Sequence, residues 1–385
     1  MVFITIGLFL IYPILTIPLI IIGSIKDKKH RIIYMMLLAF NLALISLHLD
    51  PSKYALDLNA YFSNMDNMRQ IGLESFLQIY VTQKEFLTNI LFYIYASLGN
   101  YNLWTFTVTF LCYGIFFYIL ADYAKVKDIP DKNYIIIMVV SILFYNNLYA
   151  ITGLRNSLAM MIFLLAVYIE YFKEKRNILW KILYIIPCFI HMSMAIGVIL
   201  RLCMICYKNK NKKYIILALI IYATSPSIIL YIAGKFDGVA IFSDLYAKTT
   251  HYVSGTGVGL LDNMYDLLKL ISFINLFIIF EKMYKGQKSR HRDITELICI
   301  FNFLSFNYVV IRERWYDACI ILLALSFMHN IHEYIKIKGV YKIILTGTLA
   351  CMLIIQTNFL RKIDYVELVQ KAYNQTLLQN FREES

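Results

Sequence analysis

Two ionisable side chains lie at the ends of neighbouring apolar runs in the middle of the chain. Arg155 stands at the start of one run and His191 at the end of the next, and the basic turn KEKR (173–176) separates the runs. An ionisable side chain that faces hydrocarbon costs several kcal/mol, so those kept at a membrane span usually face a cavity. If KEKR is cytoplasmic, Arg155 and His191 both lie at the opposite face. They define a candidate site.

Other charged and aromatic residues could join this site from the same face. Asp57 and Tyr61 are four residues apart, about one helical turn, so both can face one cavity. A carboxylate that is partly desolvated there could act as a general base. The late segment RERWYD contributes Arg312, Arg314 and Tyr316. The planar fork of arginine binds phosphate oxygens in a bidentate way, and the two tyrosine rings would suit a sugar face.

Each of these residues also has an ordinary structural explanation. Arg312 or Arg314 could pair with a neighbouring acid, a lone histidine is normally a hydrogen-bonded core residue, and Asp57 could be a solvated loop acid. The sequence leaves open whether His191 or Asp57 is the base. No HExxH, DxD, GxSxG or phosphate-loop motif occurs, so we expect neither a metal ion nor a cofactor.

The composition predicts that membrane-spanning helices position these residues. The chain has 385 residues, of which 60% are hydrophobic and 16% charged, and this balance excludes an ordinary soluble protein. Apolar runs of about 17–25 residues recur along it without alternating polarity, which favours helices over a barrel. The net charge of +12 resides in short loops between the runs. This is the positive-inside pattern, so we expect a lipid bilayer and no nucleic acid as partner.

The expected fold is therefore an all-α polytopic membrane protein that forms one transmembrane domain over residues 1–385. The basic turns place both termini and the segments of about 48–85, 234–266 and 360–385 outside. The run 86–98 is too short to cross and would lie along the outer interface or re-enter. About twelve spans remain, at residues 2–23, 32–47, 103–121, 134–149, 157–172, 178–191, 194–206, 214–233, 267–280, 294–311, 318–331 and 343–359.

Four short motifs resemble the EpsG-like branch of the Wzy-type polysaccharide polymerases of bacterial envelopes. The first is the outside D-x3-Y pair of Asp57 and Tyr61, and the second is the T-G-[IL]-R-[QN] turn, here 152–156. The third is the F-x-H that ends a short helix at His191, and the fourth is the late arginine cluster 312–314. The turn carries Asn156 where the family often has glutamine. By layout the resemblance covers most of the chain.

The resemblance implies a lipid-linked glycosyltransferase with a GT-C-like fold in the bacterial inner (plasma) membrane, with its active site facing the periplasm or outside. Its substrates would be undecaprenyl-pyrophosphate-linked oligosaccharides, joined into O-antigen (lipopolysaccharide), capsule or exopolysaccharide. Arg155, Arg312 and Arg314 would neutralise the leaving pyrophosphate without a metal ion. His191 or Asp57 would accept the hydroxyl proton, and Tyr61 and Tyr316 would contact substrate. A chain-length regulator protein is a possible partner.

Three other functions fit parts of the pattern. A transporter or flippase for lipid-linked oligosaccharide would also use a basic cavity, but the charges gather on one face and no internal repeat is present. An O-antigen ligase-like glycosyltransferase would perform a closely related transfer. A membrane acyltransferase would need a histidine that is reachable from inside, whereas His191 is expected outside.

Overall fold

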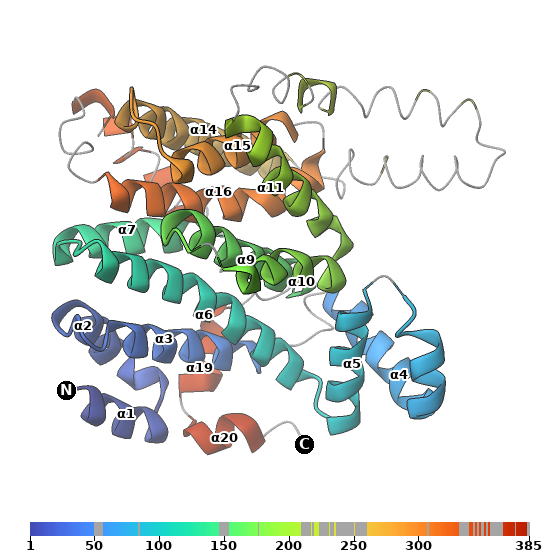
Figure 1. The fold of residues 1–385 in the computed structure, drawn as a ribbon. Helices are drawn as coiled ribbons and strands as arrows, with labels where there is room; N and C mark the ends of the chain where they lie inside the picture. The colour runs from blue at the N-terminus through green and yellow to red at the C-terminus, as the bar shows by residue number, and fades with distance from the viewer. Residues whose placement is uncertain are drawn as a thin grey trace. The chain divides into compact units, whose positions relative to one another are not determined.

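The fold consists of helices in two compact units. A computed structural model describes residues 1–49, 57–83, 85–145, 154–175, 177–208, 260–305, 308–330, 365–373 and 375–382, with isolated positions at 217–250 and 339–354. One unit comprises Met1–Ala195 with Ile354–Ser385, and the other Ile196–Leu353. Regular structure within these described ranges is entirely helical (Figure 1). This confirms the all-α prediction, and the single transmembrane domain stays a prediction.

The first predicted span, residues 2–23, is interrupted. It forms α1 (Val2–Ile11), a 3₁₀ turn (Ile14–Thr16) and α2 (Ile17–Lys26). The break falls at Tyr12, which leaves the helical region at φ −131° and ψ 85°. Pro13 follows it, and the residue before a proline is disfavoured in helical conformation. The sequence stays apolar across this break, so hydrophobicity alone predicted one continuous helix.

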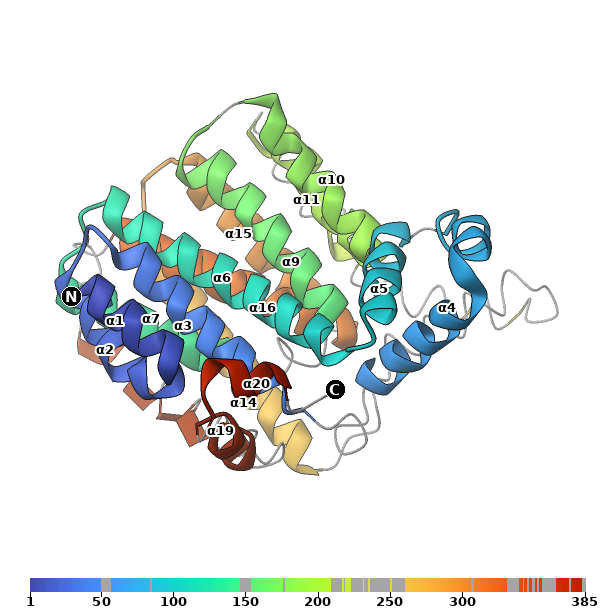
Figure 2. The same cartoon turned by 90° about the horizontal axis from the view of Figure 1, so that it is seen from below.

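The centre of the first unit is a layer of three helices. It contains α3 (Arg31–Ser46), α6 (Asn102–Val126) and α9 (Leu154–Val167), which lie side by side in Figure 2. The Phe40 ring meets the Phe106 ring edge-on, with 5.0 Å between centroids. These helices match the predicted spans 32–47, 103–121 and 157–172 because each is one uninterrupted apolar run.

Two helices in the described part of the chain are long and apolar enough to cross a membrane. They are α6 and the helix Leu154–Phe172, in which α9 continues as a π-helical turn. Shorter apolar helices of 10–17 residues accompany them, among them α3 and α5 (Phe86–Leu98). About 20 residues of helix are needed to cross hydrocarbon. These helices fit a membrane protein, whereas the count of about twelve spans stays a prediction.

Two basic turns, 26–31 and 125–132, which the positive-inside pattern predicts to be cytoplasmic, meet in the structure. Arg31, whose side chain is buried, donates to Asp131 at the start of α7 (Asp131–Phe144) over 3.0 Å. Its guanidinium also lies 4.1 Å from the centre of the Tyr134 ring. Lys28 pairs with Asp128 at 3.3 Å. The two turns therefore lie at the same end of their helices, and their cytoplasmic location stays a prediction.

The polar segment 48–85 is largely helical in the structure. It contains α4 (Asp57–Ile79), which bends at Gly72, where φ is +73°. A left-handed φ of this kind is open to glycine and strained for other residues. Helix α5 then begins at Phe86 and ends at Leu98, the bounds of the short apolar run. Its position along the membrane interface stays a prediction.

The C-terminal segment belongs to the first unit and packs against its other helices. It forms α19 (Tyr365–Tyr373) and α20 (Leu377–Arg382). Asn380 lies 2.8 Å from the ring Nε2 of His48, and the Phe381 ring meets that of Phe106. Both His48 and the tail were predicted to lie outside, and that location stays a prediction. The expected external segment 234–266 lies mostly outside the described residues.

The second unit corrects one predicted boundary. It contains α11 (Ala195–Lys208, which begins in the first unit), α14 (Leu260–Met283), α15 (Arg290–Leu304) and α16 (Val309–His329). The prediction of a span over 294–311 with an outer turn at RERWYD is wrong, because α15 ends at Leu304 and RERWYD lies inside α16. Arginine and glutamate are good helix formers, so the charged run lowers the local hydropathy without ending the helix.

Gly23 allows close packing of α2 against α3, and we expect Gly23→Ala to destabilise the protein. A Cβ at this position would overlap the ring of Tyr34, which is fully buried. Overpacking of this kind costs about 1–3 kcal/mol. Gly7→Ala is the control, because a Cβ there meets no atom within 4 Å. We expect the fraction of protein that remains folded after heating in detergent to fall for Gly23→Ala alone. Size-exclusion chromatography measures this fraction. Equal survival of the two variants would contradict the packing argument.

Candidate functional site

His191 is placed by a break between two helices. Helix α10 (Ile182–Ile190) follows a 3₁₀ turn over Ile178–Lys181 and contains Pro187. A proline lacks the N–H that a helix interior needs, which favours an early end. The helix stops at Ile190, and His191 is extended at φ −149° and ψ 114°. The sequence analysis predicted a short helix that ends at His191, and the structure confirms it. The break also releases the backbone N–H of Met192 from helical hydrogen bonding.

Glu85 approaches this break from the turn between α4 and α5. The side-chain amide of Asn89 donates to the Tyr80 carbonyl over 3.0 Å and to the Gln83 side chain over 3.1 Å, which ties the turn together. One helical position earlier, the Thr88 hydroxyl donates to the Ile190 carbonyl over 2.7 Å. The start of α5 is therefore fixed both to its own turn and to the end of α10.

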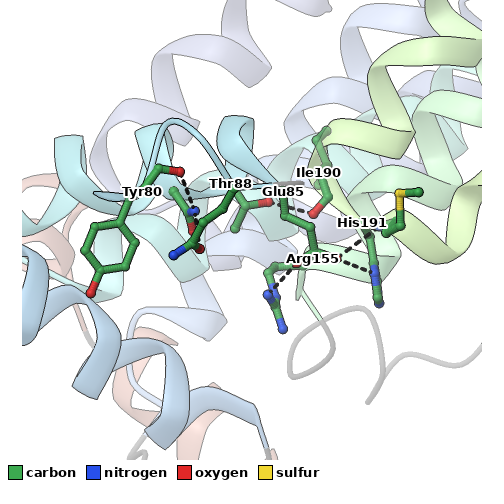
Figure 3. Close-up of polar contacts among 9 residues, drawn as sticks. Tyr80, Glu85, Thr88, Arg155, Ile190 and His191 are labelled. Atoms are coloured by element: carbon green, nitrogen blue, oxygen red, sulfur yellow. Dashed lines mark hydrogen bonds and ion pairs between the residues drawn. The ribbon is translucent and has the colours of Figure 1, made fainter. Parts of the chain in front are cut away.

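The Glu85 carboxylate joins the two ionisable residues predicted from the sequence (Figure 3). One oxygen lies 3.1 Å from Nδ1 of His191 and accepts the Met192 N–H over 3.0 Å. The other accepts from the Arg155 guanidinium over 2.9 Å. The three side chains retain exposures of 25% (Glu85), 15% (His191) and 30% (Arg155). They form a partly solvent-accessible cluster, which we call the Glu85 cluster.

Tyr61 completes the cluster on the arginine side. Its ring is buried, and the Arg155 guanidinium lies 4.9 Å from the ring centre. Tyr61 in turn packs against Phe92 of α5, with 5.5 Å between the ring centroids. A guanidinium within about 6 Å of an aromatic face is attracted by the ring quadrupole. The orientation of Arg155 is therefore set by an aromatic face as well as by a carboxylate.

The surroundings keep Glu85 ionised. Burial raises the pKa of its carboxyl, but hydrogen bonds from His191 and the Met192 N–H, together with the positive charge of Arg155, lower it by more. The net effect takes the pKa from 4.5 to about 2. A carboxylate hydrogen-bonded to an imidazole Nδ1–H fixes the tautomer that leaves the Nε2 lone pair to accept a proton. It also stabilises the imidazolium that then forms.

Glu85→Gln should therefore change the acid sensitivity of the protein. Since the folded-state pKa is lowered, the stabilisation by ionised Glu85 is complete above pH 4.5 and is lost as the pH falls towards 2. Heat resistance of the wild type should exceed that of Glu85→Gln at pH 7, and the difference should shrink between pH 4.5 and 2. Glu74→Gln, at an exposed position of α4, is the control. If the difference in heat resistance between wild type and Glu85→Gln stayed constant from pH 4.5 to 2, the lowered pKa of Glu85 would be contradicted.

The remaining predicted site residues are distributed as follows. Asp57 is the first residue of α4, one turn before Tyr61, and its side chain lies outside the described residues. Thr152 and Gly153, which begin the predicted turn, lie outside them too. Arg312, Arg314 and Tyr316 belong to α16 in the second unit. The structure thus joins Arg155, His191 and Tyr61 in one unit and Arg312 with Tyr316 at a pocket of the other.

Sequence reasoning did not single out Glu85. The chain separates it from Arg155 by 70 residues and from His191 by 106. The available signal was an acid at the end of a predicted external segment, directly before an apolar run. Topology would have placed that acid on the same face as Arg155 and His191. Among the described residues, no group of three His, Cys, Asp or Glu side chains could hold a metal ion.

Fold and family together define the class of protein. Apolar helices and a polar cluster at helix ends fit an all-helical membrane protein. The sequence model of the EpsG family matches residues 52–368, which is most of the chain, and the protein therefore belongs to the EpsG family. This membership suggests a polysaccharide polymerase-type role. Neither the curated proteins nor the solved structures contain a significant match.

Proposed function

We propose that this protein polymerises oligosaccharide repeat units carried on undecaprenyl pyrophosphate. The growing glycan passes to the non-reducing end of a new lipid-linked unit on the outer face of the bacterial plasma membrane. The product is an O-antigen, capsule or exopolysaccharide, as made by Wzy-type polymerases. The fold is a GT-C-like bundle of about twelve spans. Family membership supports the class of reaction, and the Glu85 cluster supplies groups suited to it.

The observation that carries the proposal is the Glu85 bridge between a histidine and an arginine. Glycosyl transfer from a pyrophosphate lipid needs a base for the attacking hydroxyl and a cation for the leaving group. His191 and Arg155 are those two groups, and they contact opposite oxygens of one carboxylate. A shared partner fixes the distance between base and cation before substrate binds, so little ordering is left for the reaction step.

In the reaction, the acceptor hydroxyl attacks the anomeric carbon of the donor glycan. The bond from that carbon to the pyrophosphate oxygen breaks, and its electron pair leaves with undecaprenyl pyrophosphate. The hydroxyl proton moves to Nε2 of His191, and Glu85 at Nδ1 stabilises the resulting imidazolium. Asp57, one turn from Tyr61, is the alternative base.

Arg155 stabilises the negative charge that develops on the leaving pyrophosphate. Its guanidinium has five N–H donors in a planar fork, so it can hold Glu85 with one edge and a phosphate with another. Arg312 and Arg314 are further pyrophosphate-binding residues, and Tyr61 and Tyr316 contact substrate. Because arginines supply the positive charge, the reaction needs no metal ion. A chelator should leave the rate of a purified reaction unchanged, and loss of activity would refute this step.

Polymer length in cells tests the proposal against export. A strain that lacks this gene should make surface glycan with a single repeat unit, and the wild-type gene should restore a ladder of lengths on gels. Absence of any external repeat unit in the deletion strain would instead show failed export. The transporter function would then replace polymerisation. A chain-length regulator partner would alter the length distribution of the restored ladder.

A further inference from the structure

One turn of α5 holds the helix break that carries His191. The turn runs from the N-cap residue Glu85 to Thr88, and its side chains contact four consecutive residues, 189–192 (Figure 3). Each residue of that segment has its own contact, which is made in chain order by a ring, a carbonyl, an imidazole and an N–H. The segment that follows the end of α10 is therefore held along its whole length by a helix from a distant part of the chain.

The Thr88 hydroxyl makes the central contact. It donates to the Ile190 carbonyl over 2.7 Å, and the two residues are 0% and 2% exposed. Next to it, the His191 N–H donates to the Pro187 carbonyl over 2.8 Å, and the Met194 N–H donates to the His191 carbonyl over 3.0 Å. The last carbonyls of a helix lack an intrahelical donor, and a buried carbonyl without a partner is unfavourable. Thr88 is the donor that satisfies the last carbonyl of α10.

The polar side chains of this turn serve the break and not their own helix. Glu85 and Thr88 occupy the N-cap and third positions of α5, where polar side chains ordinarily bond to the N–H groups of the helix's own start. The Glu85 side chain makes no such cap bond, and its two oxygens accept from residues outside α5. The Thr88 hydroxyl likewise donates outside α5. Both side chains are thus directed towards the segment 190–192.

We propose that Thr88 is a positioning residue for the base of the transfer reaction. Its hydrogen bond fixes Ile190, and this determines where the adjacent His191 imidazole meets the Glu85 carboxylate. The inference rests on the proposed function, in which His191 accepts the hydroxyl proton. Thr88 is fully buried, so it acts through His191 and not by contact with substrate.

Peptide geometry explains why one buried hydroxyl affects the rate. The Ile190 carbonyl belongs to the same planar peptide unit as the nitrogen of His191. Thr88 therefore fixes the backbone before His191, and Glu85 fixes the backbone after it by accepting the Met192 N–H. Misplacing a reacting group by about 1 Å can cost about 10²-fold in rate. Without the Thr88 bond, this peptide unit can rotate and carry the imidazole away from Glu85.

A graded series of donors at position 88 tests the inference. Thr88→Val keeps the branched shape without a hydroxyl, Thr88→Ser keeps the hydroxyl, and Thr88→Cys supplies only a weak S–H donor. We expect Thr88→Val to lower the kcat of purified protein roughly 10–100-fold, while KM for the lipid-linked repeat unit stays near its wild-type value. Thr88→Ser should recover most of the rate, and Thr88→Cys should lie between them. If Thr88→Val does not fold, equal rates of the Ser and Cys variants would contradict the inference.

The second readout does not depend on polymerisation. Diethyl pyrocarbonate acylates the unprotonated nitrogen of an imidazole, and peptide mass spectrometry gives the rate of this modification at each histidine. Because Glu85 holds the His191 ring, the rate at His191 should rise severalfold in Thr88→Val and stay at the wild-type value in Thr88→Ser. His30, which contacts Asp27 in the turn 26–31, is an internal reference whose rate should not change.

Thr109→Val is the matched control. Thr109 is also fully buried in a helix, α6, but its hydroxyl has no hydrogen-bond partner among the residues that the structure describes. It should leave both kcat and the modification rate of His191 at their wild-type values. A Thr88→Val protein that loses heat resistance but keeps both of these values would overturn the inference, because Thr88 would then be purely structural.

The inference and the proposed function can fail separately. If wild-type protein forms no polymer while the modification rates follow the expected pattern, polymerisation fails and Thr88 still positions His191. If polymer forms and Thr88→Val behaves as wild type in both readouts, the inference fails alone.

Discussion

His191→Gln is expected to lower the polymerisation rate by roughly 10²–10⁴-fold, the usual contribution of a general base. Glutamine preserves a polar side chain at the end of α10 but cannot accept the hydroxyl proton. In cells that carry this variant, surface glycan should stop at one repeat unit while the protein remains in the membrane at wild-type level. The readout is the gel ladder together with the initial rate of undecaprenyl pyrophosphate release by purified protein.

His30→Gln is a matched control for this prediction. His30 also contacts a carboxylate through Nδ1, at 2.9 Å from Asp27, but in the predicted cytoplasmic turn. It should polymerise at the wild-type rate. A His191→Gln protein that still forms full-length polymer would remove histidine from the chemistry and leave Asp57 as the base. Asp57→Asn would then have to show the large loss instead.

Arg155→Gln should lower the rate by about 10²–10³-fold, as is typical when a donor to a developing oxyanion is removed. The loss should appear mainly in kcat, because the charge that Arg155 neutralises grows as the pyrophosphate leaves. Arg155→Lys retains the charge but loses the planar fork that can hold Glu85 and a phosphate together, so it should recover only part of the rate.

Arg292→Gln is the control for the arginine. Arg292 pairs with Glu281 at 3.0 Å, much as Arg155 pairs with Glu85, but it lies in α15 of the second unit. It should leave polymer length unchanged. An Arg155→Gln protein with normal kcat and reduced heat resistance would show that the Arg155–Glu85 pair is structural.

Long apolar runs made the helices of the first unit predictable from the sequence. The spans at α3, α6 and α9 were predicted because each is one continuous hydrophobic run, and a short helix was expected before His191 because few residues separate it from the KEKR turn. Helix boundaries that depend on local backbone geometry could not be predicted from hydrophobicity. Apolar composition concealed the break at Tyr12, and the charge of RERWYD suggested a turn where the backbone remains helical.

The sequence could predict the site only in part. Membrane topology indicates which face a residue reaches, but it does not indicate which side chains touch. It placed Arg155 and His191 on one face, and the structure shows both in contact with Glu85. Topology could place Glu85 on that face but could not show that it contacts both residues, because these contacts arise from packing of the α4–α5 turn against the end of α10, between segments distant in sequence.

Polymerisation is tested most directly by a reaction with purified wild-type protein and lipid-linked single repeat units as its sole substrate. We expect products with two or more repeat units on one lipid, and one undecaprenyl pyrophosphate released for each new glycosidic bond. Both should disappear with His191→Gln. Recovery of unchanged single repeat units from protein that binds the lipid would contradict polymerisation.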